Sequence, residues 1–200
     1  MSIYYISDTH FGHANIIRLS NRPFRDIAEM NDELIARWNA KVTDDDDVYM
    51  LGDFAYRSAE AASVIAGRLK GRKHLVIGNH DNRWMKEPKA CAQFVEIARL
   101  MEIDDGGRLV TLCHYPMMSW HDMAHERGWH VHGHIHENTD APYWPLLRSM
   151  DKALNACVEV NHYEPVTLAE LIRNNRAWKD AHEPSQRRDF DPSLHASSLK

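Results

Sequence analysis

The sequence predicts an α/β protein in which a parallel sheet packs against a second, mixed sheet. Two observations favour this fold. Up to residue 77, short apolar runs alternate with segments of helical periodicity, which is the pattern of strand–helix–strand units with parallel strands. After residue 94, the apolar runs are joined by a hairpin turn and longer polar loops, which is typical of a mixed sheet. The length suits one domain with a substantial core.

The elements of the first half begin and end at recognisable caps and turns. Asn31 is expected to cap a helix over residues 32–41, whose apolar side chains share one face. Ser58 is expected to cap an Ala-rich helix that reaches Leu69. Three short apolar runs are expected to be strands, at residues 3–6, 48–51 and 74–77.

The second half is predicted to contain a hairpin and two further strands. Residues 95–103 and 108–113 flank Asp104-Asp105-Gly106-Gly107, a strong hairpin signal. The further strands are expected at residues 129–131 and 153–160.

A helix and a polar tail close the chain. Thr167 and Glu170 form a capping box that opens a last helix toward Arg176. We therefore expect a single domain over residues 1–180 and a flexible C-terminal tail over residues 181–200.

The composition limits the class of protein. A net charge of −5 and a pI near 6.3 give no sign of a chain built to coat nucleic acid, although they do not exclude a local basic groove. No apolar stretch approaches the roughly 18 residues that span a bilayer, and the N-terminus lacks signal-peptide features. The three cysteines show no CxxC spacing, which disfavours a disulfide framework or a thiolate zinc site. Cys113 and Cys157 lie in apolar runs and are expected to be small core residues. We expect a cytoplasmic protein.

Five polar clusters lie beside the apolar runs, and ligands gather beyond the carboxyl ends of strands in such folds. The clusters are Asp8-Thr9-His10, Gly52-Asp53, Gly78-Asn79-His80-Asp81, His114 and Gly133-His134-Ile135-His136. Together they offer the nitrogen and oxygen ligands that divalent metals take, too many for one ion but enough for two ions that share a carboxylate. Each cluster alone has an ordinary explanation as a turn or a core histidine. The set points to two-metal hydrolysis of a phosphate ester.

As an ordered set, the clusters resemble the five blocks of the calcineurin-like metallophosphoesterase superfamily. Those blocks read Asp-x-His/Asp, Gly-Asp, Gly-Asn-His/Asp, His and Gly-His-x-His, and all are present without substitution between residues 8 and 136. The chain closely resembles the small bacterial and phage phosphoesterases of this superfamily that lack an added domain. The resemblance implies a two-sheet β-sandwich flanked by helices, an α/β/β/α fold, in a single domain.

The resemblance also implies a role for each matching residue. The first metal would be held by Asp8, His10 and His136, the second by Asn79, His114 and His134, and both would be bridged by Asp53. His80 would contact the substrate phosphate and help to protonate the leaving oxygen, and Asp81 would orient its ring. A hydroxide shared by the ions would attack the phosphorus. Mn²⁺ is the first expectation for both ions, with Fe²⁺, Co²⁺, Ni²⁺ or Zn²⁺ as alternatives.

Four residues outside the blocks are weaker candidates for substrate binding. His13 and Asn15 follow the first block and could line the cleft, with support or surface roles as the alternative. Arg22 and Arg25 could clamp a phosphate with their planar guanidinium groups, and a solvated surface loop is the alternative for both.

The sequence thus predicts a metal-dependent phosphohydrolase that acts on a phosphate ester, such as a nucleotide, without a covalent intermediate. A phosphodiesterase is favoured over a monoesterase because His80 can protonate a poor leaving group and no cap domain is evident. One alternative is a nuclease, which would need a basic path. Another is a non-catalytic scaffold, which would be expected to have lost metal ligands.

Overall fold

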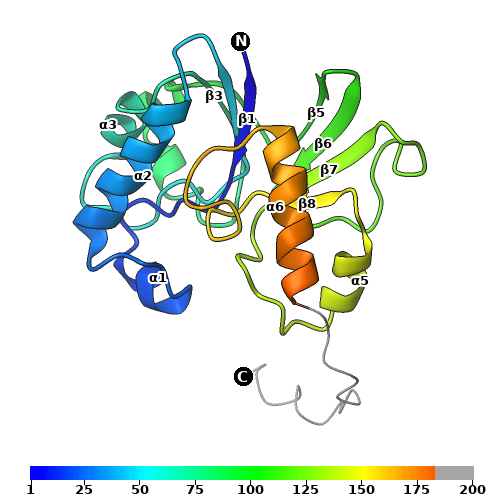
Figure 1. Ribbon diagram of the computed structural model, residues 1–200. Coiled ribbons are helices and arrows are strands. Elements are labelled where there is room, and N and C mark those ends of the chain that lie inside the picture. Colours follow the sequence, from blue (N-terminus) through cyan, green and yellow to red (C-terminus); the bar gives the residue numbers. More distant parts are fainter. Residues whose placement is uncertain (183–200) are drawn as a thin grey trace.

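Two four-stranded sheets packed face to face form the core of the computed structural model, which describes residues 1–182 (Figure 1). The first sheet is wholly parallel, in the order β1 (Ile3–Ile6), β2 (Asp47–Met50), β3 (Arg72–Val76) and β4 (Phe94–Ala98). The second sheet is mixed, in the order β5 (Leu100–Asp105), β6 (Arg108–Cys113), β7 (Gly128–His132) and β8 (Ala153–Asn155). In the second sheet β5 and β6 are antiparallel and the other pairs are parallel. The predicted two-sheet α/β/β/α fold is confirmed.

Helices cover the outer faces of the two sheets (Figure 1). The first sheet is covered by α2 (Ile27–Lys41) and α3 (Ala62–Gly67), whose apolar side chains share a buried cluster with strand residues such as Val48 and Leu75. Beside the second sheet, α5 (Trp144–Ser149) and α6 (Leu168–Ala181) bring Trp144 against Trp178. The shorter helices are α1 (Ala14–Leu19), η1 (Trp84–Lys86) and α4 (Pro88–Cys91). Within residues 1–182, no helix combines the length and apolar character needed to cross a bilayer.

Two predicted helix starts are wrong. The α2 helix begins at Ile27, since the side chain of Asp26 accepts a hydrogen bond from the Glu29 amide and caps it there. Asn31 therefore lies inside the helix, where its side-chain oxygen accepts a hydrogen bond from the amide of Gly12. The α3 helix begins at Ala62 rather than after Ser58, and it has no side-chain cap.

The predicted strand over residues 95–103 is two strands in different sheets. β4 ends at Ala98 beside β3, and β5 begins at Leu100 beside β6, so the chain changes sheets at residue 99. The predicted hairpin turn is confirmed, with Gly106 and Gly107 at φ 63° and 85° between β5 and β6.

The last predicted strand is shorter than expected, and the last helix is longer. β8 ends at Asn155, because the following residues turn toward the first sheet, where Cys157 forms a bridge with Ser7. The α6 helix starts at the predicted capping box and continues to Ala181. Of the predicted tail over residues 181–200, residues 183–200 lie outside the described residues.

Candidate metal centre

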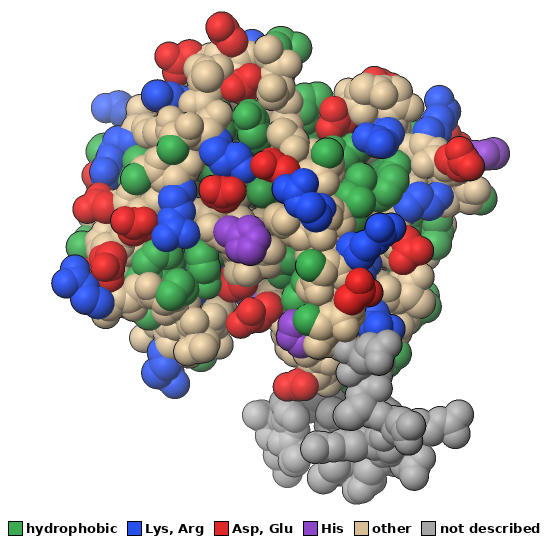
Figure 2. Space-filling model, viewed as in Figure 1, with side chains coloured by type: hydrophobic (Ala, Val, Ile, Leu, Met, Phe, Trp, Pro, Cys, Tyr) green, Lys and Arg blue, Asp and Glu red, His purple; other side chains and the backbone are tan. Residues whose placement is uncertain are grey.

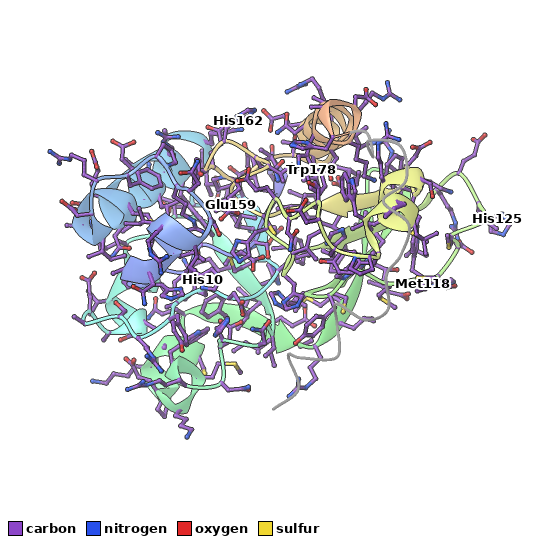
Figure 3. The ribbon with its side chains drawn as sticks, turned by 90° about the horizontal axis from the view of Figure 1, so that it is seen from below. His10, Met118, His125, Glu159, His162 and Trp178 are labelled. Carbon is purple, nitrogen blue, oxygen red and sulfur yellow. The ribbon has the colours of Figure 1, made fainter. Side chains whose placement is uncertain are left out.

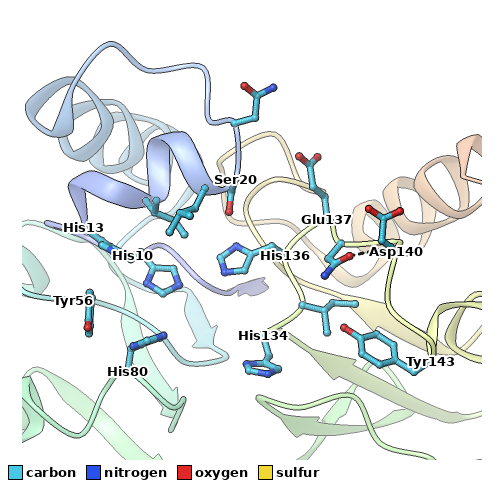
Figure 4. Close-up of a pocket in the computed structure, with 15 residues that line it drawn as sticks. His10, His13, Ser20, Tyr56, His80, His134, His136, Glu137, Asp140 and Tyr143 are labelled. Carbon is cyan, nitrogen blue, oxygen red and sulfur yellow. Dashed lines mark hydrogen bonds between the residues drawn. The ribbon is translucent and has the colours of Figure 1, made fainter. Parts of the chain in front are cut away.

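The five polar clusters meet where the strands of both sheets end. Asp8, Asp53 and Asn79 follow β1, β2 and β3, while His114 follows β6 and His134 follows β7. Several ligand candidates have positive φ angles, a region that non-glycine residues rarely occupy. They are Asp8 (57°), His10 (51°), Asp53 (56°), His134 (71°) and His136 (50°). Of these residues, His10, His134 and His136 line one pocket (Figure 4), and such backbone strain is common at functional sites.

Asp8, His10 and His136 form the first ligand group. Asp8 Oδ1 lies 3.8 Å from His10 Nε2 and 3.7 Å from His136 Nε2. The two imidazole rings stack with their centroids 5.2 Å apart. Asp8 Oδ1 and His10 Nε2 are buried and have no hydrogen-bond partner among the described residues. Buried polar atoms seldom lack partners, so these atoms fit a site that binds a cation.

Asn79, His114 and His134 form the second group. His114 Nδ1 lies 2.7 Å from the carbonyl oxygen of Leu51, and its Nε2 lies 2.9 Å from Asn79 Oδ1. A neutral imidazole has one N–H and can donate to only one of these oxygens. If Nδ1 donates to the Leu51 carbonyl, the lone pair of Nε2 faces the acceptor oxygen of Asn79. A cation bound by His114 Nε2 and Asn79 Oδ1 would relieve the repulsion between these two atoms. The His134 ring packs edge-on against His114, with centroids 5.1 Å apart.

Asp53 lies between the two groups. Its Oδ2 atom is 3.6 Å from His10 Nε2 and 3.7 Å from His114 Nε2, so one carboxylate faces both. Burial and the charge of Asp8 raise the pKa of Asp53 to about 7. Two neighbouring buried carboxylates are costly unless a positive charge compensates them, which is what a divalent cation supplies.

The second oxygen of Asp8 is held by hydrogen bonds from three different segments. Asp8 Oδ2 accepts from Ser7 Oγ at 2.5 Å, from the His134 amide at 2.8 Å and from Cys157 Sγ at 3.2 Å. These contacts fix the carboxylate with Oδ1 directed at the histidines. Cys157 is buried as the sequence predicts, but it contacts a ligand candidate as well as the core. No local signal could have indicated this contact, because Asp8 and Cys157 are 149 residues apart.

The predicted role of Asp81 is wrong in its detail. Its two carboxylate oxygens accept hydrogen bonds from the amides of Gly78, Asp53 and Phe54 and from the indole of Trp84, at 2.7–2.9 Å. These four donors occupy the carboxylate, so Asp81 orients the backbone of two ligand loops rather than the ring of His80. The loop then places His80, whose amide donates to Asp53 Oδ1 at 2.8 Å.

A cavity of about 790 Å³ opens over the ligand groups (Figure 4). Its wall includes His80, whose side chain is 36% exposed and whose Nε2 lies 4.0 Å from Asp53 Oδ2. His13 lines the same cavity, as predicted, and its ring contacts the ring of Tyr56. Tyr143 lies at the opposite side. Asn15 is exposed on α1 and does not line the cavity.

Arg22 and Arg25, the two predicted phosphate-binding arginines, do not line this cavity. Arg22 is not a free phosphate clamp, because its side chain is fully buried in an ion pair with Glu159, with Nη2 and Oε1 2.8 Å apart. The alternative of a solvated loop is also wrong for Arg22. That alternative holds for Arg25, whose side chain is 81% exposed and paired with Glu29.

Fold and site together place an Asp/His cluster that could hold metal at the carboxyl ends of strands from two packed sheets. Residues 1–147 match the family described as the calcineurin-like phosphoesterase superfamily domain, and the chain belongs to this superfamily. Members typically bind divalent metals, and two groups here could hold them: Asp8, His10 and His136, and Asp8, Asp53 and His114.

Similar proteins span most of the chain. The uncharacterized protein MJ1445 of Methanocaldococcus jannaschii is 39% identical over 173 residues, which cover 86% of this chain and 89% of that protein. The gene 66 protein of Mycobacterium phage D29 is 29% identical over 162 residues, covering 68% and 78%. The crystal structure of AQ665, a protein of unknown function from Aquifex aeolicus, has a TM-score of 0.66 and 28% identity, covering 86% of this chain and 97% of that one. These relatives agree with the fold but name no substrate.

Proposed function

We propose that this protein is a phosphodiesterase that uses two divalent metal ions to hydrolyse a small phosphate diester. The observation that carries the proposal is the position of Asp53 Oδ2, which lies within 3.7 Å of the imidazole nitrogens of both ligand groups. When bound, two such ions neutralise the phosphate charge and lower the pKa of water enough to supply a nucleophile near neutral pH.

The protein's own residues would complete the chemistry. His80 stands in the cavity wall with an exposed ring, where it can donate a hydrogen bond to a phosphate oxygen or a proton to the leaving group. Burial lowers the pKa of His80, and an anionic phosphate beside the ring would favour its protonated form. Asp81 supports this role by holding the amide of Gly78 in the same loop.

The cavity supports a small substrate. Its volume of about 790 Å³ lies in the range of small-molecule sites. Among the described residues that line it, none is Lys or Arg, whereas Glu137 and Asp140 are acidic. A long polyanion would gain little from such a wall, while hydroxyl or base groups of a small diester, such as a cyclic nucleotide, could bond to these carboxylates and stack on Tyr56 or Tyr143.

A nuclease is the second candidate, favoured by one observation. A neighbouring cavity of about 680 Å³ is lined by Arg57, Arg83 and Lys86, although Glu60 and Glu87 share it. On the face shown in Figure 2, basic and acidic side chains are interspersed, and this mixture offers little continuous attraction to a polyanion.

Hydrolysis assays of the metal-loaded protein should decide among these functions. With Mn²⁺, and with Ni²⁺ and Zn²⁺ in parallel, we expect hydrolysis of bis(p-nitrophenyl) phosphate and of a small diester from a nucleotide panel. Faster cleavage of single-stranded DNA or RNA than of every small diester, lost in Arg57→Ala, would favour the nuclease. A protein that binds two ions yet is inactive on all aryl and nucleotide esters would overturn the enzymatic proposal and favour a scaffold.

A further inference from the structure

Glu159 lies in the interior of the protein (Figure 3), and its carboxylate contacts the ring of the ligand candidate His136. Its Oε1 atom is 2.9 Å from His136 Nδ1, and it accepts hydrogen bonds from Arg22 Nε at 3.0 Å and Arg22 Nη2 at 2.8 Å. The side chains of Glu159 and Arg22 are 1% and 0% exposed. A buried carboxylate is therefore neutralised by one arginine and directed at one imidazole.

Arg22 extends this network to the first ligand loop. Its Nη1 donates to the carbonyl oxygen of Thr9 at 2.8 Å, and its Nη2 donates to that of Asp8 at 2.7 Å. The loop carries Asp8 and His10, both of which have positive φ angles. The same guanidinium thus fixes the strained backbone of two ligand candidates and, through Glu159, the ring of the third.

We propose that Glu159 and Arg22 are positioning residues that set the affinity of the first metal site separately from that of the second. This inference rests on the proposed two-metal function. When His136 Nδ1 donates to Glu159, the lone pair of Nε2 faces Asp8 Oδ1, and an anionic partner makes the imidazole a stronger ligand. The second site has different supports, since His114 Nδ1 faces the Leu51 carbonyl.

Electrostatics agree with this role. The Arg22 guanidinium donates two hydrogen bonds to Glu159 Oε1 and compensates the charge of this buried carboxylate. The contact with His136 is therefore made by a carboxylate that is paired with a cation. Glu159 also lies beyond residues 1–147, which carry the match to the superfamily domain.

A substitution at Glu159 can remove the charge with little change of shape. Glu159 Oε2 has no hydrogen-bond partner among the described residues, so Glu159→Gln can place its NH₂ group there and keep an acceptor at Oε1. Asp47 offers a matched control. It also joins an arginine to a histidine, accepting from Arg72 Nε at 2.9 Å and lying 2.9 Å from His74 Nε2, but it stands at the opposite end of β2 from Asp53.

The test is calorimetric titration of metal-free full-length protein with Mn²⁺ and Zn²⁺, for the wild type, Glu159→Gln and Asp47→Asn. Loss of a partner that supports a ligating histidine typically costs about 10–100-fold in metal affinity. We expect Glu159→Gln to weaken one of two sites by about tenfold or more and to leave the other within about twofold. Asp47→Asn should bind metal at both sites with wild-type affinity. The site that remains in Glu159→Gln should match the one that remains in His136→Ala.

Other outcomes would overturn the inference. Wild-type affinity at both sites of Glu159→Gln, or equal weakening of both sites, would show that Glu159 has only a structural role. If Glu159→Gln does not fold, the same metal titration of Arg22→Lys tests the proposal. Lysine keeps the positive charge but cannot make all of the hydrogen bonds of the arginine. Unchanged first-site affinity in Arg22→Lys would then refute the proposal. A wild type that binds fewer than two ions would instead refute the proposed two-metal function.

Discussion

Replacing Asp53 by asparagine should stabilise the metal-free protein while it abolishes two-metal binding. Asp53 is 2% exposed, and in the absence of a cation its charge is opposed by burial and by Asp8. The asparagine side chain would keep an acceptor for the His80 amide, which now donates to Asp53 Oδ1 at 2.8 Å. The substitution therefore removes an unfavourable charge without removing this hydrogen bond.

The size of the effect follows from the pKa. The carboxyl group titrates near 3.9 in an unfolded chain and at about 7 in the fold. At about 1.36 kcal/mol per pH unit, this difference corresponds to about 4 kcal/mol of lost folding free energy above pH 7. Between these pKa values the folded protein binds more protons than the unfolded chain, so this contribution to stability decreases as the pH rises from about 4 to 7. The advantage of Asp53→Asn should grow over the same range.

Urea denaturation in the presence of EDTA, at several pH values between 5 and 8, measures this effect. Asp47→Asn is the control with the opposite sign, because the hydrogen bond from Arg72 lowers the pKa of Asp47 and its charge stabilises the fold. If metal-free Asp53→Asn were no more stable than the wild type at pH 7.5, the electrostatic account of the site would be refuted.

Three further predictions concern the metals and the catalytic loop. His80→Ala should keep two bound ions but lower kcat by roughly 10²–10⁴-fold on esters with poor leaving groups, and unchanged turnover would remove His80 from the mechanism. The metal dissociation constants should rise about tenfold per pH unit below about pH 7, where a proton competes for Asp53, and calorimetry that shows no pH dependence would contradict this. Asp81→Asn should lower the free energy of unfolding by about 3 kcal/mol, because the NH₂ group of the asparagine would face amide donors. If the variant were as stable as the wild type in urea, these hydrogen bonds would contribute little to stability.

The ligand candidates could be predicted from the sequence because each stands in a short cluster just after an apolar strand. To predict that Asp8, Asp53 and Asn79 lie close together, it is enough to know that parallel strands end at the same edge of a sheet. The supporting residues could not be found in this way. Arg22 and Glu159 are 137 residues apart, and each alone is typical of a solvated surface.

The predicted ends of some helices and strands were wrong for a related reason. Residues 95–103 form one continuous run of strand-like sequence, and only pairing with β3 on one side and β6 on the other divides it between two sheets. The start of α2 depended on which of two good caps, Asp26 or Asn31, the chain uses, and the packing of Met30 in the core favours the earlier one.

Anomalous X-ray diffraction from crystals of the Mn²⁺-loaded protein would test the shared carboxylate most directly. The account predicts two anomalous peaks about 3.5–4 Å apart, with Asp53 in contact with both ions. A single peak, or two peaks of which only one contacts Asp53, would contradict it.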